Sequence, residues 1–98
     1  LDNLPQSLKE LYCYDNNLIN LDNLPKSLKT LYCNDNKITN LDNLPLNLEI
    51  LYCNSNNLIK LDNLPQSLKE LDCNNNPLIY NFKPTLENIK NYNSNKKN

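Results

Sequence analysis

Residues 21–40 read LDNLPKSLKTLYCNDNKITN, and the same pattern recurs every 20 residues along the chain. Four identical copies of Leu-Asp-Asn-Leu-Pro begin at Leu1, Leu21, Leu41 and Leu61. Between these copies, columns of leucine, cysteine and asparagine return in register without an insertion. A period of this length predicts a repeat architecture in which each unit is stabilised by packing on its neighbours.

Each unit carries the pattern of one short strand. Leu11 and Cys13 alternate with outward residues, which is typical of a strand with one buried face. Stacked units would pair such strands in parallel, about 4.8 Å apart. Pro25, like Pro45 and Pro65, has a fixed backbone angle and no amide hydrogen. The segment that leads from one strand back to the next therefore cannot be a regular helix across its proline. We therefore expect short parallel β-strands on a concave side, an extended or 3₁₀ convex side, and little α-helix.

The repeated unit, L-x-x-L-x-C-x-x-N-x-[LI]-x-x-L-D-N-L-P-x-[SN], resembles the leucine-rich-repeat signature at each fixed position over residues 1–80. Its length and its Leu-Pro step are similar to the short repeats of bacterial effectors of the IpaH and YopM type. Its cysteine column and asparagine-rich spacing are similar to uncharacterised repeat proteins of giant amoebal viruses. The resemblance implies a leucine-rich-repeat solenoid of four 20-residue coils over residues 1–80.

The two ends depart from the repeat. Residues 81–92 imitate the leucine and proline spacing in shortened form, which predicts a degenerate C-terminal capping coil, with a short helical turn over Thr85 to Tyr92 as the alternative. Residues 93–98 contain no apolar side chain and are predicted to be a disordered tail. At the other end no capping pattern precedes Leu4, so we expect end-to-end self-association through the uncapped N-terminal coil. Sedimentation of a strict monomer at high concentration would contradict this expectation.

Charge and composition argue against several classes of function. The net charge is -1 and the ten positive charges are lysines scattered along the chain, which speaks against a nucleic-acid partner. No apolar run approaches the length of a membrane span, so no membrane partner is expected. Free core thiols persist best in a reducing compartment, and no Asn-x-Ser/Thr glycosylation site occurs. We therefore expect a cytoplasmic protein, in the host cytoplasm if it is viral or an effector.

Three columns allow both a structural and a functional interpretation. The cysteines lack the close pairs of zinc sites, and neighbouring parallel strands rarely allow the disulfide torsion, so we favour core thiols over a disulfide or a metal site. The asparagine amides can bond the bending backbone, which predicts a structural ladder. The aspartates are expected to form turns rather than to bind a cation, and we expect no metal and no cofactor. These columns are Cys13, Cys33, Cys53 and Cys73; Asn16, Asn36, Asn56 and Asn76; and Asp2, Asp22, Asp42 and Asp62.

The outward side chains of the predicted strands form the candidate site. A ladder of three tyrosines that ends in an aspartate offers amphipathic area of the kind that interface hot spots use. Stacked tyrosines also stabilise neighbouring strands, and both roles remain open. The candidate binding residues are Tyr12, Tyr32, Tyr52, Asp72, Tyr14, Glu10 and Lys29, and the same face is edged by Thr30, Ile50, Glu70, Lys9, Glu49 and Lys69.

The sequence favours binding over catalysis. No histidine is present to activate a thiol, and every cysteine belongs to the inward column, so we expect no enzyme activity. We expect a protein interaction module that binds an unidentified protein or peptide on the concave, tyrosine-rich face. The alternatives are structural spacer coils of a longer repeat protein, or the substrate-recognition part of a ubiquitin-ligase-like effector, which the bacterial resemblance implies.

Overall fold

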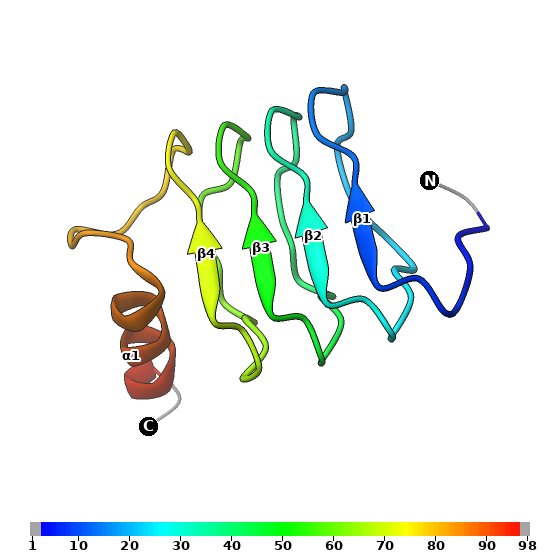
Figure 1. Cartoon of the computed structure of the whole chain (residues 1–98). Helices are drawn as coiled ribbons and strands as arrows, with labels where there is room; N and C mark the ends of the chain where they lie inside the picture. Colours follow the sequence, from blue (N-terminus) through cyan, green and yellow to red (C-terminus); the bar gives the residue numbers. More distant parts are fainter. Residues whose placement is uncertain (1–2, 97–98) are drawn as a thin grey trace.

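The computed structural model describes residues 3–96, which form one four-stranded parallel sheet and one helix (Figure 1). The strands are β1 (Glu10–Tyr12), β2 (Thr30–Tyr32), β3 (Ile50–Tyr52) and β4 (Glu70–Asp72), and the helix is α1 (Leu86–Lys96). The strands lie in the order β1-β2-β3-β4, and each neighbouring pair is parallel. The predictions of short parallel strands and of little helix are therefore confirmed.

The strand register follows the sequence repeat. Paired residues are 20 positions apart throughout the sheet, as between Leu11 and Leu31. Hydrogen bonds between units continue past the strands. Cys13 N donates to the Tyr32 carbonyl oxygen at 2.9 Å, and the equivalent bonds recur in the next two units at 2.8 Å. Each 20-residue unit therefore adds one strand at the same place in the stack.

A sharp turn follows each strand. Asp15, Asp35, Ser55 and Asn75 adopt left-handed backbone angles, with φ between 57° and 60°. Aspartate and asparagine enter this region more readily than most non-glycine residues, because their short polar side chains hydrogen-bond locally. The chain contains no glycine, so polar residues occupy turn positions where glycine would be usual.

Each unit returns on the far side of the core through a turn at its proline. Leu28 N donates to the Pro25 carbonyl oxygen at 3.2 Å, and the equivalent bond recurs at Leu8, Leu48 and Leu68. No 3₁₀ helix occurs within residues 3–96, so the 3₁₀ alternative for this side is wrong for that range. A single turn is enough to lead the chain back toward the sheet, because the leucine that closes the turn already packs in the core.

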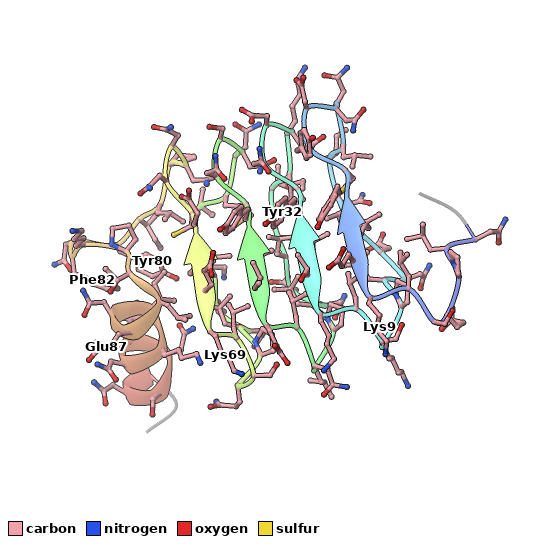
Figure 2. The ribbon with its side chains drawn as sticks, viewed as in Figure 1. Lys9, Tyr32, Lys69, Tyr80, Phe82 and Glu87 are labelled. Carbon is pink, nitrogen blue, oxygen red and sulfur yellow. The ribbon has the colours of Figure 1, made fainter. Side chains whose placement is uncertain are left out.

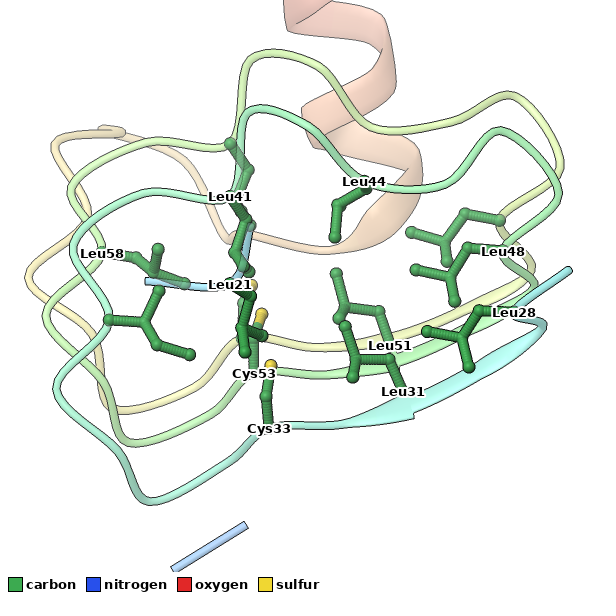
Figure 3. Close-up of a cluster of buried hydrophobic side chains, with 14 of the residues drawn as sticks. Leu21, Leu28, Leu31, Cys33, Leu41, Leu44, Leu48, Leu51, Cys53 and Leu58 are labelled. Carbon is green, nitrogen blue, oxygen red and sulfur yellow. The ribbon is translucent and has the colours of Figure 1, made fainter. Parts of the chain in front are cut away.

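The core lies between the sheet and the returning segments (Figure 3). On the strand side, Leu31 and Cys33 of one unit and Leu51 and Cys53 of the next are completely buried. Leu41, from a returning segment, points toward them from the other side. Burial of one such leucine is worth about 1.5 to 3 kcal/mol, and here it is achieved only when units stack on one another.

Burial is uneven along the stack. Leu28, Leu31 and Ile38 in the second unit have no exposed surface, whereas Leu8 and Leu11 in the first unit are only partly buried. Within the described residues, an inner unit is covered on two sides and the first unit on one. The inner units therefore contribute most of the apolar burial.

The segment after β4 is not a fifth coil. No strand follows β4 as far as residue 96, and the chain instead forms α1, which lies beside β4 at the end of the sheet (Figure 1). The predicted coil over residues 81–92 is therefore wrong in form, and the helical alternative over Thr85 to Tyr92 is nearer to the structure. The predicted disorder is wrong for residues 93–96, which belong to α1, and residues 97–98 lie outside the described residues.

Tertiary contacts explain why α1 extends into the polar tail. Thr85 Oγ1 accepts a hydrogen bond from Asn88 N at 3.1 Å and so caps the start of the helix. Ile89 is completely buried in the core. Asn93 Nδ2 donates to the Leu61 carbonyl oxygen at 2.8 Å, which ties the last turns of the helix to the fourth unit. The prediction of disorder was based on the polar composition of residues 93–98, which carries no information about these contacts.

Candidate interaction face

The outward side chains of the four strands form one face of the sheet, which we call the tyrosine face. Because the strands are parallel and in register, equivalent residues form rows across the sheet. Tyr32 projects from this face near the middle of the sheet (Figure 2). The two rows consist of Glu10, Thr30, Ile50 and Glu70, and of Tyr12, Tyr32, Tyr52 and Asp72.

The three tyrosines are stacked. The ring centroids of Tyr12 and Tyr32 are 4.7 Å apart, and those of Tyr32 and Tyr52 are 4.5 Å apart with an interplanar angle of 8°. These distances match the spacing of neighbouring strands, so the sheet itself imposes the stack. Tyr12 is 54% exposed, whereas Tyr32 and Tyr52 are half-buried by their neighbours. The rings pack on one another and present edges and hydroxyls to solvent.

Carboxylates orient the hydroxyls at both ends of the stack. Tyr12 Oη donates to Glu10 Oε1 at 3.2 Å. Tyr52 Oη donates to Glu70 Oε2 on the neighbouring strand, and this hydrogen bond raises the pKa of Tyr52 to about 12. Asp72 Oδ1 accepts a hydrogen bond from Asn74 N at 3.1 Å. The tyrosine face is therefore both aromatic and acidic.

Two of the candidate binding residues lie at its margin. Tyr14 follows β1 and is 51% exposed. Lys29 precedes β2, and its Nζ lies 3.5 Å from Glu49 Oε2 in an exposed ion pair that contributes little to stability. Lys9 and Lys69 likewise lie near the starts of β1 and β4 (Figure 2). The structure thus brings Tyr12, Tyr32, Tyr52, Glu10 and Asp72 onto the sheet and leaves Tyr14 and Lys29 at its margin.

The asparagine column forms a continuous ladder along the turn that follows the strands. Asn56 Nδ2 contacts the carbonyl oxygens of Cys53 at 3.0 Å and Cys33 at 3.1 Å, and Asn56 Oδ1 accepts from Ile38 N at 3.0 Å. The Asn56 amide therefore bonds its own unit and the one before it. The same pattern holds at Asn36 and Asn76.

The cysteine column runs through the core. All four thiols, at Cys13, Cys33, Cys53 and Cys73, are buried and free. Burial raises the pKa of Cys33 to about 12 and that of Cys73 to about 11, and it raises the pKa of Cys53 well above its usual range. A thiol in this environment stays protonated at neutral pH, so it is a poor nucleophile and a poor metal ligand.

The aspartate column remains at the surface. Asp22 and Asp42 are exposed, and Asp62 Oδ2 lies 3.2 Å from Lys60 Nζ. Asp2 lies outside the described residues. Within residues 3–96, no group of three or more histidine, cysteine, aspartate and glutamate side chains is arranged to hold a metal ion.

The sequence did not reveal a cavity at the end of the tyrosine ladder. This cavity is a surface hollow of about 430 Å³, widely open to solvent, between β3, β4 and the segment that leads into α1. No local motif marks it, because it depends on the path of the chain after β4. Its lining includes Tyr52, Glu70, Asp72, Lys83, Pro84 and Thr85.

Within residues 3–96, α1 is the helix to consider for a membrane span, and it is too short and too polar to cross a bilayer. Comparisons with protein-family models, with curated proteins and with solved structures found no match to this chain.

Proposed function

We propose that this chain is a leucine-rich-repeat solenoid whose tyrosine face binds a partner protein or peptide. The 20-residue period, the one strand per unit and the stacking of strands in sequence order support the solenoid. Four free thiols in the core suit a reducing compartment, and the proposal therefore places the protein in the cytoplasm.

The observation that carries the binding role is the exposed tyrosine ladder. Tyrosine supplies a large rigid surface with a polar tip, and such residues dominate the energetics of many interfaces. Here the rings are held by stacking, so little side-chain freedom remains to be lost when a partner binds. The neighbouring Glu10 and Asp72 add charge that can select a partner.

A binding role is preferred to a catalytic one. The thiols of Cys33 and Cys53 are fully buried with raised pKa values, which is the opposite of an activated nucleophile. The chain has no histidine that could serve as a base beside them.

Two related proposals use the same face differently. In a ubiquitin-ligase-like effector, the face would select the substrate for a separate catalytic domain. In a structural spacer, the tyrosines would only pack, and the stacking of Tyr32 on Tyr52 supports that role. The spacer proposal predicts that the hydroxyls and ring edges are dispensable for any interaction.

The test is a pull-down from a eukaryotic host-cell lysate with a variant in which Tyr12, Tyr32 and Tyr52 are changed to serine. The matched control changes three exposed isoleucines outside the tyrosine face to serine. These are Ile19, Ile59 and Ile79, which are 61%, 48% and 67% exposed. Circular dichroism must first show that both variants fold.

A partner that the tyrosine variant loses and the isoleucine variant retains is the expected result. A partner that both variants retain would move binding to another surface and would favour the spacer. If only the isoleucine variant loses the partner, the interface would lie on the surface that carries Ile19, Ile59 and Ile79.

A further inference from the structure

The cavity at the end of the tyrosine ladder has the size of a small binding site. Its volume of about 430 Å³ falls within the range of about 300 to 1,000 Å³ that is common for ligand sites. It is bounded by Tyr52 of β3, by Glu70 and Asp72 of β4, and by Lys83 and Pro84 ahead of α1. It is the place where the sheet meets the segment leading into the helix.

The cavity is also bordered by a ring face of Tyr52 that stacks on no other aromatic ring. Tyr32 lies between Tyr12 and Tyr52, so both of its ring faces are covered by other rings. Tyr52 stacks on Tyr32 with one face, and its other face turns toward β4. On β4 the residue paired with Tyr52 is Asp72, which has no aromatic ring that could stack on this second face of Tyr52. The ladder thus ends in an aromatic surface that borders the cavity.

The charge of this region favours a cation. The outward strand positions carry three carboxylates and no lysine, namely Glu10, Glu70 and Asp72. The cavity lining carries two carboxylates, those of Glu70 and Asp72, and one ammonium group, that of Lys83. Glu70 accepts from the Tyr52 hydroxyl and Asp72 accepts from Asn74 N, and each carboxylate has further lone pairs to accept with.

We propose that this cavity binds an arginine side chain of the partner protein or peptide. A guanidinium group is planar, so it can stack on the face of Tyr52 that lies away from Tyr32 while its N–H groups donate to Asp72 and Glu70. Lysine lacks the planar fork that would satisfy a ring and two carboxylates together. The inference rests on the proposed function for the source of the arginine, but the site itself can be tested without the partner.

The experiment uses the intact chain and N-acetyl-arginine amide at millimolar concentration, followed by backbone amide shifts in NMR spectra. N-acetyl-citrulline amide, which is neutral and nearly the same shape, is the matched probe. Saturable shifts at Tyr52, Glu70 and Asp72 with the arginine probe, and not with citrulline, are expected. Asp72→Asn should weaken binding about tenfold, because it removes one charge-assisted acceptor and retains the oxygen that accepts from Asn74 N.

Two variants keep the result interpretable. Tyr52→Leu should abolish the shifts, whereas Asp15→Asn, in the exposed turn after β1 at the opposite end of the sheet, should leave them unchanged. Equal shifts with citrulline, unsaturable shifts spread over the surface, or unchanged affinity in Asp72→Asn would each overturn the proposal. If arginine does not bind but the pull-down still depends on the tyrosines, the interaction face stands and only its arginine site is lost.

Discussion

At the scale of single residues, one column of identical side chains contains members of very different structural importance. Asn56 is 6% exposed, and its amide bonds carbonyl groups of two units while accepting from a third group, Ile38 N. Asn16 is exposed and donates to Cys13 and Tyr14 of its own unit. Position in the stack, and not the residue type, decides how many backbone groups depend on the amide.

Asn56→Ala should therefore lower the free energy of unfolding by about 3 kcal/mol, because it leaves several buried backbone groups without partners. Asn16→Ala is the matched control and should cost about 1 kcal/mol, since water can reach the groups that it exposes. Urea titration followed by circular dichroism measures both values. Equal losses at the two positions would show that contacts between units are not what makes the ladder stabilising.

At the scale of elements, α1 depends on docking more than on its own sequence. Its eleven residues contain four asparagines, which are weak helix formers, and an isolated helix of this length is marginal in water. The contacts that compensate are the burial of Ile89 and the hydrogen bonds that Lys90 Nζ donates to the Gln66 and Leu68 carbonyl oxygens. Helix and last unit should therefore form together.

Ile89→Ala should lower the free energy of unfolding by about 3 kcal/mol and should reduce the helical signal before the sheet unfolds. The same substitution at Ile79, which is 67% exposed, should change stability by less than about 0.5 kcal/mol. Thermal melts with circular dichroism distinguish the two. A similar effect at both positions would mean that α1 does not cover the end of the core.

At the scale of the whole molecule, the cysteine column links the stability of all four units to pH. Burial raises the native pKa of Cys33 to about 12 and that of Cys53 well above the ordinary value of 9.0. Above pH 9.0 the unfolded chain releases thiol protons that the native chain keeps, so the unfolded state is favoured. The stabilisation is complete below this pH and is lost as the pH rises toward the native pKa.

The free energy of unfolding should consequently fall by about 1.4 kcal/mol per pH unit for each such thiol as the pH rises above about 9. Urea titrations over a series of alkaline pH values give the slope. A double variant, Cys33→Ala with Cys53→Ala, serves as the control for titrating tyrosines and lysines. It should be less stable at neutral pH but should show a shallower slope, and an unchanged slope would rule out the thiols as its cause.

The amino-acid pattern alone is enough to predict the units and the strands within them. Alternation of Leu11 and Cys13 with outward residues is local, and the 20-residue period repeats it at every unit, so parallel pairing in register follows. The row of tyrosines could be predicted for the same reason. The left-handed turns at Asp15, Asp35, Ser55 and Asn75 were not predicted, because turn formation was assigned to the aspartate column instead.

The end of the stack, in contrast, depends on contacts between segments that are distant in the sequence. Residues 93–96 are polar enough to predict disorder, yet they are helical because Ile89 is buried and Asn93 bonds Leu61. The cavity beside Tyr52 arises in the same way, from a segment whose path is set by the end of the sheet. Within the repeat each unit packs against a nearly identical unit, so the pattern of one unit also predicts the surface that covers it. The last unit packs against a segment that is not part of the repeat, and the 20-residue period carries no information about that contact.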